Sequence, residues 1–323
     1  MMIKSIRDRF TRLNANPLTG WLITIEAIAL SWIMATRLSG GDDLFRFYYK
    51  IAWGCPECSY LPWYASWIFF PLRFVPAEIA WPLMMALTLL VVLYATQKFN
   101  VSMLVVVLSF PLISQLWLGQ VDWLIIAGLL LAFFAPSPWL RGAGIVLASL
   151  KPQITLAAIP LALWYDRERW KTVLVPIVVV AASLLVWGID WPIRWWLIRE
   201  QRFDLTAWVA APLAYNPLPY LSIFVVREKQ QKLAAALLSA ALTIPAFGVY
   251  SYVTFLVTLA PWWAIPLSYA WALGYPFMGN LSLRLAWVLP LGLLAFLVWP
   301  SARTWWANYR VQRSARPATS PQP

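Results

Sequence analysis

The chain has 323 residues, of which 62% are hydrophobic and only 12% are charged, whereas roughly a quarter of the residues in a soluble domain are charged. A soluble domain cannot hide so much apolar surface from water, so the composition indicates an integral membrane protein. Histidine is absent, which excludes serine–histidine and cysteine–histidine catalysis and removes the commonest metal ligand. The net charge of +12 lies at the termini and in short loops, a distribution that fits anionic headgroups and not nucleic acid.

Apolar runs of roughly the length of a membrane span recur along the chain. The first run follows a basic arm and lacks a small-residue cleavage site, so we interpret it as an uncleaved helix and not as a signal peptide. Helices are predicted at residues 21–35, 79–95, 101–116, 121–135, 172–187, 207–226, 233–249, 251–273 and 285–299. Trp and Tyr gather at the ends of these runs, as they do at membrane interfaces.

These runs, with further short or broken segments, predict an all-α integral membrane protein with about nine to eleven transmembrane or re-entrant helices. Residues 1–300 are expected to form a single polytopic domain. Residues 301–323 are basic and rich in small polar residues and proline, and we expect them to be a disordered tail.

Basic residues predict which loops face the cytoplasm. The N-terminal arm is basic, so the N-terminus is predicted to be cytoplasmic in an inner or plasma membrane, and residues 37–78 extracytoplasmic. Lys98 returns the chain to the cytoplasm, and residues 118–122, without Lys or Arg, lie outside. In the last third, the basic residues at 227–232 and 303–316 both indicate cytoplasmic segments. Two cytoplasmic segments require an even number of spans between them, but three apolar runs are predicted there. Either residues 261–273 contain another short segment, or the tail breaks the rule.

The apolar stretch at residues 142–164 is interrupted by Lys151-Pro152. Arg141 before the stretch and the block at residues 167–171 after it are both basic, so both ends should be cytoplasmic. Two half-length segments with Lys151 at an outward tip satisfy this requirement; the alternative is one kinked span whose lysine reaches an interface. Broken helices and charges within the membrane are functional suspects.

Cys55 and Cys58 form the only cysteine pair. A zinc site would need four ligands, and a thioredoxin-like role would need a βαβ context, which the sequence lacks. In an extracytoplasmic loop, a local disulfide is the favoured state.

Two adjacent carboxylates, Asp42 and Asp43, follow the first predicted helix and precede an aromatic run at residues 45–49. A carboxylate at a membrane surface can act as a general base on a sugar or lipid hydroxyl. The alternative is a solvated acidic loop. The charge pattern places these carboxylates on the same outer face as Gln120, Asp122 and Lys151.

The order of several short motifs resembles the GT87 family of GT-C glycosyltransferases, which includes polyprenyl-phosphate-mannose-dependent α-mannosyltransferases. The similarity spans roughly residues 37–171. It rests on residues 41–49 (Gly-Asp-Asp-Leu-Phe-Arg-Phe-Tyr-Tyr), 60–63, 70–72, 75–76, Trp81, Pro111, 119–122, 142–144, 151–152 and 167–171.

The resemblance implies a GT-C-like fold and inverting transfer of a hexose, with mannose expected, from a polyprenyl-phosphate donor to an extracytoplasmic hydroxyl of a glycolipid or glycan. It assigns the general base to Asp43, or else to Asp42, and the donor phosphate to Lys151. No cofactor is expected beyond this lipid-linked co-substrate, and a metal requirement stays open. The other implied substrate-binding residues are Gln120, Asp122, Tyr48, Tyr49 and Arg46.

Two other functions are kept as alternatives. The short C-terminal half suits a catalytically degenerate GT-C subunit of a membrane complex. In the enzyme interpretation, Asn216 is a candidate acceptor-side polar group from this half. The break at Lys151 suits a lipid or solute transporter, although the sequence contains no inverted repeat.

Overall fold

The computed structural model describes residues 17–202, 211–245 and 247–314. Every regular element in this part of the chain is helical, so the predicted all-α class is confirmed. The helices of eight or more residues are α2 (Pro17–Arg37), α5 (Ala77–Lys98), α7 (Phe110–Leu118), α8 (Asp122–Phe134), α9 (Pro138–Ala148), α11 (Ala158–Tyr165), α12 (Arg169–Trp187), α13 (Trp191–Arg202), α16 (Lys229–Thr243), α19 (Ala270–Met278), η6 (Gly279–Trp287) and α20 (Val288–Ser314). The short elements are η1 (Leu44–Tyr48), α3 (Tyr49–Ala52), η2 (Pro56–Cys58), α4 (Ala65–Phe69), η3 (Phe70–Phe74), α6 (Met103–Val107), α10 (Pro152–Thr155), η4 (Leu218–Leu221), α15 (Ser222–Val225), η5 (Val249–Tyr252), α17 (Val253–Leu256) and α18 (Ala264–Ser268).

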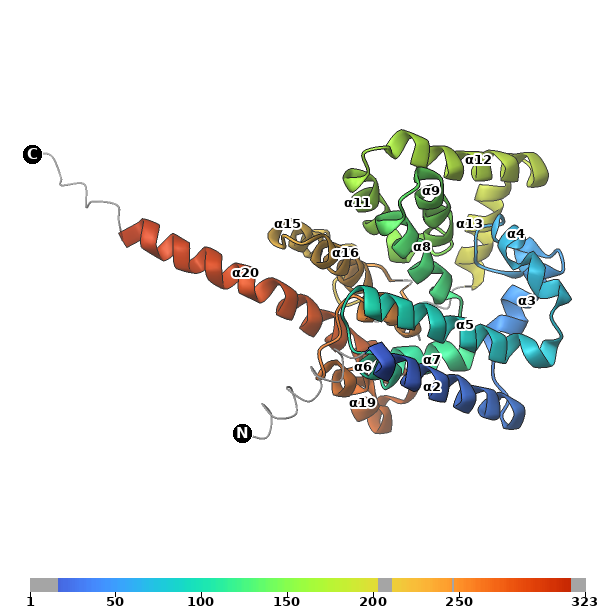
Figure 1. Ribbon diagram of the computed structural model, residues 1–323, viewed down its shortest axis with the longest axis horizontal. Helices are drawn as coiled ribbons and strands as arrows, with labels where there is room; N and C mark the ends of the chain where they lie inside the picture. The colour runs from blue at the N-terminus through green and yellow to red at the C-terminus, as the bar shows by residue number, and fades with distance from the viewer. Residues whose placement is uncertain (1–16, 203–210, 246, 315–323) are drawn as a thin grey trace, which may run out of the picture.

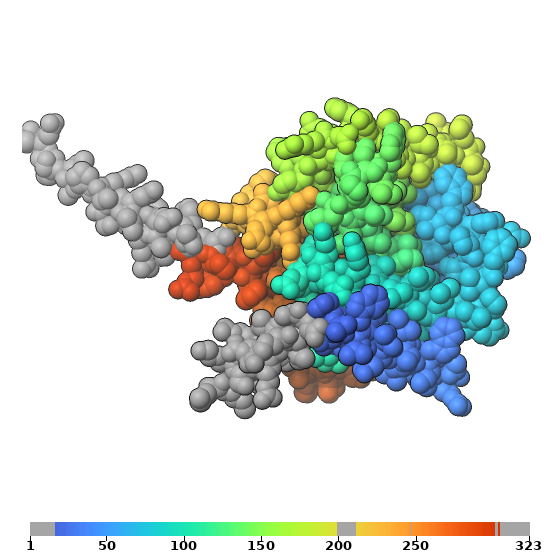
Figure 2. Space-filling model, in the orientation of Figure 1, coloured from blue at the N-terminus to red at the C-terminus, as the bar shows by residue number. Residues whose placement is uncertain are grey.

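The longer helices of the first two thirds form a row. α2 packs on α5, α5 on α8, α8 on α9, and α9 on α12. Figure 1 shows this order, with α16 and α20 beside the row. In the space-filling view the same order appears as bands that run from blue α2 to yellow-green α12 (Figure 2).

Three glycines bring α9 against both of its neighbours in the row. A Cβ on Gly128 of α8 would lie 2.5 Å from the backbone N of Ala148, and a Cβ on Gly144 would lie 2.5 Å from the backbone N of Ala132. Gly142 is two residues earlier and therefore on the other face of α9, where a Cβ would lie 2.5 Å from the carbonyl O of Thr172. Small residues allow membrane helices to approach at backbone distance. The end of α9 is therefore held firmly in place.

Within the described residues, four segments are long and apolar enough to cross a membrane: α2, α5, α12 and Ala264–Pro300. α7 and α8 meet at 115° and together form either a fifth, broken span or a re-entrant loop. Exposed apolar side chains such as Leu22 and Ile25 of α2 and Leu185 of α12 suit contact with lipid. The described residues thus fit a multi-pass membrane protein, with fewer full-length spans than the nine to eleven helices predicted.

Prolines explain why several predicted spans are short. The run at 101–116 divides into α6 and α7, with Pro111 in the first turn of α7. The run at 251–273 divides into α17, α18 and α19, with Pro261 and Pro266 between or within them. The span predicted at 207–226 is wrong for its described part, which contains only η4 and α15. A proline ring removes a backbone N–H and clashes with the preceding helical turn.

The C-terminal helix differs from its predicted boundary. α20 continues to Ser314, so the tail predicted to be disordered from Ser301 begins as helix. Residues 315–323 and the basic N-terminal arm at residues 1–16 lie outside the described residues.

The predicted break at Lys151-Pro152 is confirmed. α9 ends at Ala148, and the short α10 begins only at Pro152. At the other end of this hairpin, Arg141 at the start of α9 forms ion pairs with Asp166 (3.0 Å) and Glu168 (3.2 Å), which follow α11. The two arms therefore start and finish at one end of the molecule, with Lys151 at the opposite tip. Lys151 is 2% exposed, so the alternative of a kinked span with an interfacial lysine is wrong.

Candidate functional site

Segments from four parts of the chain meet at the tip of the α9–α11 hairpin. The Lys151 ammonium donates a hydrogen bond to Gln120 Oε1 (2.8 Å) and forms an ion pair with the Asp122 carboxylate. The side-chain nitrogen of the same Gln120 donates to the Asp43 carboxylate. The predicted base and the predicted cation are thus joined through one amide side chain.

The Gln120 amide is oriented by its neighbours. Its oxygen accepts hydrogen bonds from Lys151, from the Tyr48 hydroxyl (2.8 Å) and from the Tyr60 hydroxyl (3.3 Å). A flipped amide would turn its own N–H groups towards these donors and would take a donor away from Asp43. The surrounding hydroxyls and the ammonium therefore direct the amide N–H towards Asp43.

Two tyrosine rings complete the surroundings of the ammonium. Lys151 Nζ lies 4.8 Å from the ring centroid of Tyr250 and 5.9 Å from that of Tyr60. Aromatic faces attract cations, and the attraction increases when the cation is desolvated. Tyr250 and Tyr60 therefore help to hold a buried positive charge.

Asp122 supplies the counter-charge to Lys151. It lies in the first turn of α8, where the positive end of the helix dipole stabilises a carboxylate. Its Oδ2 accepts a hydrogen bond from the Ser251 hydroxyl (2.6 Å), and the residue is fully buried. Ser251 and Tyr250 come from η5, so the C-terminal half contributes to the site. Sequence reasoning missed both residues; the polar Tyr-Ser-Tyr at 250–252, inside an apolar run, was the available signal.

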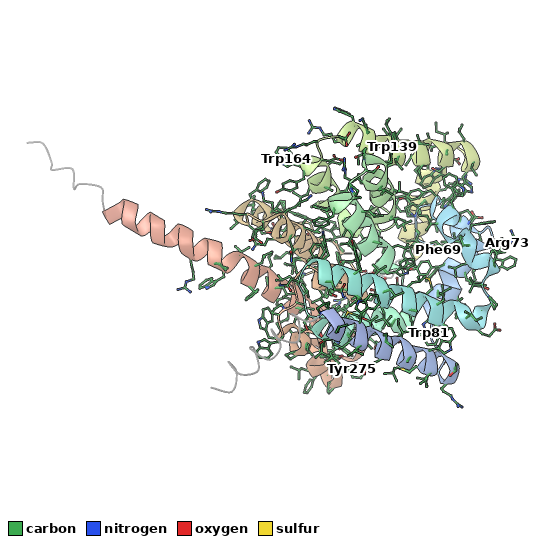
Figure 3. All side chains as sticks on the ribbon, in the orientation of Figure 1. Phe69, Arg73, Trp81, Trp139, Trp164 and Tyr275 are labelled. Carbon is green, nitrogen blue, oxygen red and sulfur yellow. A yellow bond between two sulfur atoms is a disulfide. The ribbon has the colours of Figure 1, made fainter. Side chains whose placement is uncertain are left out.

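Close backbone packing docks the Asp43 segment on the Gln120 turn. Gly119 has a φ of +68°, and a Cβ there would lie 2.8 Å from Leu44 Cβ. The backbone N–H of Gly41 donates to the carbonyl of Trp117 (2.8 Å). Trp81 Nε1 donates to the carbonyl of Leu116 (2.9 Å) from the α5 side; Trp81 is labelled in Figure 3. The turn thus accepts only glycine at 119 and keeps Gln120 opposite Asp43.

Asp43 is the carboxylate of this network that reaches solvent. It is partly exposed, whereas Gln120, Asp122 and Lys151 are buried. Burial raises the pKa of Asp43 above its ordinary value of 3.8, although Lys151 and the Gln120 hydrogen bond lower it in part. A carboxylate with a raised pKa is a stronger base than a free aspartate. The Asp43 carboxylate is therefore the basic group at the accessible edge of the network.

The structure separates some of the predicted site residues from this network. Asp42 and Arg46 form an exposed ion pair (3.2 Å) on a different face of the same helical segment. They line an outer cavity of about 370 Å³. Tyr49 donates to the carbonyl of Val75 (2.7 Å) and so anchors the loop before α5. Asn216 accepts from the backbone N–H of Leu218 (3.0 Å), which is the role of a turn residue. Of the predicted residues, the structure brings together Asp43, Tyr48, Gln120, Asp122 and Lys151.

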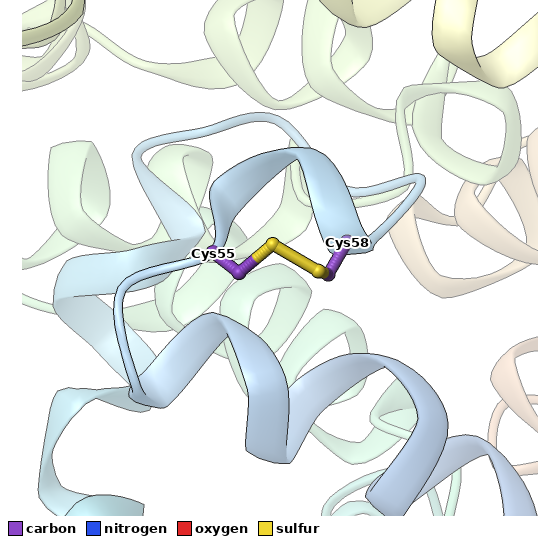
Figure 4. Close-up of a disulfide and its surroundings, with 2 residues drawn as sticks. All are labelled: Cys55 and Cys58. Carbon is purple, nitrogen blue, oxygen red and sulfur yellow. A yellow bond between two sulfur atoms is a disulfide. The ribbon is translucent and has the colours of Figure 1, made fainter.

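The predicted disulfide is confirmed. Cys55 and Cys58 are bonded across the single turn of η2 (Figure 4). This closed turn directly precedes Tyr60, whose hydroxyl joins the Gln120 network. The disulfide therefore restricts a loop that delivers a site residue.

Within the described residues, no group of three or more acidic, cysteine or histidine side chains is arranged to hold a metal ion. Comparisons of the chain with family models, curated proteins and solved structures find no match. The geometry of the Asp43–Gln120–Lys151–Asp122 network and its chemistry are therefore the basis for assigning a function.

Proposed function

We propose that the protein is a membrane glycosyltransferase with a GT-C-like fold, which moves a hexose from a polyprenyl-phosphate donor to an acceptor hydroxyl. The observation that supports this proposal is the position of Asp43. It is a partly exposed carboxylate of raised pKa, oriented by Gln120 at the edge of a buried ion-pair network. General bases work best when they are held in place and when their pKa approaches the working pH. The resemblance of residues 37–171 to the GT87 family points to the same chemistry.

In the proposed reaction, Asp43 accepts the proton of the acceptor hydroxyl, and the oxygen of that hydroxyl attacks C1 of the donor hexose. The bond between C1 and the phosphate oxygen breaks, and its electron pair leaves with the polyprenyl phosphate. The configuration at C1 inverts. The leaving phosphate gains one negative charge, so the reaction requires a cation near the phosphate.

We assign the donor phosphate to the outer cavity beside Asp42. Lys151, expected to meet the phosphate, is buried and already neutralised by Asp122, and it acts in this proposal as a positioning residue for Gln120. Arg46 and Lys50 line the outer cavity together with apolar surfaces of Phe45 and Trp117, which suit a prenyl chain. The Arg46–Asp42 pair is exposed, and such pairs are worth at most about 1 kcal/mol, so a phosphate can replace Asp42.

The test is transfer by the purified full chain in vesicles that contain polyprenyl-phosphate mannose and a panel of glycan acceptors. Asp43→Asn is expected to lower turnover by about 10²–10⁴-fold, the range typical of a general base. The matched control is Asp190→Asn, which removes an exposed carboxylate outside the network. Full turnover by folded Asp43→Asn would contradict the assignment of the base.

A transporter is the second candidate, and the buried Lys151–Asp122 pair at a helix break is the observation that favours it. Intramembrane charge pairs at broken helices are also found in ion-coupled transport. Uptake of a lipid or solute by protein-containing vesicles, without a covalent product and sensitive to Asp122→Asn, would favour transport over transfer.

A further inference from the structure

A second cavity, of about 460 Å³, lies at the other end of α8 from the Asp43 network. The first residue of α8, Asp122, belongs to that network, whereas its last residues, Phe133 and Phe134, line the cavity. With a rise of 1.5 Å per residue, the two sites are separated by about 18 Å along the helix. The cavity walls also include the start of α9, the end of α11, the loop before α12, and the first residue of α16. It is therefore a separate site, and a role for it does not depend on the proposed transfer reaction.

The carboxylates of this cavity are already paired. Asp166 accepts from the Arg141 guanidinium and from the Thr172 hydroxyl. Glu168 accepts from Arg141 (3.2 Å) and from Lys171 (2.9 Å). Arg141 Nη1 also donates to the carbonyl groups of Ala135 (3.1 Å) and Pro136 (3.0 Å), which directly follow α8. Arg141 and the two carboxylates therefore satisfy one another within the cavity wall.

Two cations of the cavity wall have no such partner. In the described part of the chain, no carboxylate lies within ion-pair distance of Arg167 or Lys229. Arg167 is exposed, whereas Lys229 is partly buried. Asp166 acts on Lys229 only at longer range, and the cavity lining holds three cations against two carboxylates, so it has a surplus of positive charge.

The Lys229 ammonium is held in place at the cavity wall. Its Nζ donates to the carbonyl of Phe133 (2.7 Å) and lies 5.2–5.4 Å from the ring centroids of Phe133, Phe134 and Tyr165. An ammonium has three N–H donors, and one carbonyl uses one of them. The remaining donors are available to a ligand at little further cost in side-chain ordering.

Exposed tryptophans suit a position of this end of the molecule at a membrane interface. Trp164 and Trp170 are 78% and 79% exposed, and Trp139 is also exposed. Figure 3 shows Trp139 and Trp164 at the edge formed by α9 and α11. Tryptophan rings collect at headgroup depth, and basic pockets between membrane helices suit phosphate-bearing headgroups.

We propose that this cavity binds a phosphate-bearing anion through Lys229 and Arg167, and that an anionic lipid headgroup supplies the phosphate at this depth. Phe133 and Phe134 give the cavity an aromatic wall, against which an attached acyl chain can pack. The sequence predicts the same end to be cytoplasmic, from the basic residues that flank α9 and α11.

The test is native mass spectrometry of the detergent-solubilised full chain with added phosphatidylglycerol, phosphatidylcholine or inorganic phosphate. Wild-type protein is expected to retain one more molecule of phosphatidylglycerol than of phosphatidylcholine. Each basic residue near a lipid surface contributes about 1 kcal/mol, so Arg167→Gln with Lys229→Met should weaken binding about thirtyfold. Arg169→Gln, an exposed basic residue outside the cavity lining, is the matched control and should bind like wild type.

Arg167→Gln alone keeps the test valid if the double variant does not fold, because Arg167 is exposed; it should weaken binding about fivefold. Equal retention of phosphatidylglycerol by wild type and the variants would overturn the site. Retention of inorganic phosphate but not of the lipid, lost in the same variants, would support phosphate recognition and overturn the lipid source.

Discussion

Replacing Lys151 with methionine tests whether the buried ion pair holds the site together. Lys151 is 2% exposed and Asp122 is fully buried, so the substitution leaves a carboxylate without its counter-charge in a medium of low dielectric constant. Breaking a buried pair by removing one partner typically costs about 3–5 kcal/mol. We therefore expect Lys151→Met to lower the free energy of unfolding by about this amount. Asp122→Asn should cost a similar amount, because it leaves the ammonium uncompensated.

The double variant decides whether the loss comes from the pair. Lys151→Met with Asp122→Asn removes both charges, keeps side chains of similar size, and retains an acceptor for Ser251. If the two single losses were additive, the double variant would be destabilised by their sum. We expect it to be more stable than this sum implies by at least about 3 kcal/mol. The assay is unfolding in mixed detergent micelles with increasing dodecyl sulfate, followed by tryptophan fluorescence.

The exposed Arg46–Asp42 pair provides the control for this cycle. Its side chains are 69% and 56% exposed, and exposed pairs couple by at most about 1 kcal/mol. If the double variant lost as much unfolding free energy as the two single variants together, Lys151 and Asp122 would not be coupled and the reasoning would be refuted.

Three further perturbations address the base, the packing and the loop. Gln120→Leu removes a hydrogen bond that lowers the pKa of Asp43; because a base is lost as the pH falls through its pKa, the acid limb of the pH–rate profile should move to higher pH. Gly144→Val places side-chain atoms where even a Cβ would lie 2.5 Å from a backbone nitrogen of α8; circular dichroism melts should show a loss of about 2 kcal/mol or more. Cys55→Ser with Cys58→Ser opens a loop of only three-residue separation; the chain-entropy relation gives a loss of about 2 kcal/mol, measurable by the same melts.

Local signals in the sequence predicted the parts of the site that depend on single positions. A charge followed by proline inside an apolar stretch predicted the break at Lys151, because a helix cannot continue through that ring and a charge requires protein around it. The distribution of basic residues placed Asp43, Gln120 and Lys151 on one face. Each of these inferences uses residues close together in the chain.

The pairing within the site depends on contacts between distant segments, which composition does not encode. The resemblance implied a substrate-binding role for Asp122, whereas in the structure its carboxylate pairs with Lys151 and accepts a hydrogen bond from Ser251. The apolar composition of residues 207–226 predicted a span there. Composition takes no account of Pro212, Pro217 and Pro219, which prevent a continuous helix in the described part. The number of spans was therefore harder to predict than the class of the fold.

The network around Gln120 contains two carboxylates and one ammonium, so it carries one surplus negative charge while Asp43 is ionised. That surplus sits on the member that solvent and acceptor can reach. When Asp43 takes up a proton, the cluster becomes electrically neutral, at the same step in which a leaving phosphate would acquire its second negative charge. Proton transfer would thus move negative charge away from the protein interior and onto the departing lipid, which removes the repulsion between the two at the moment of separation.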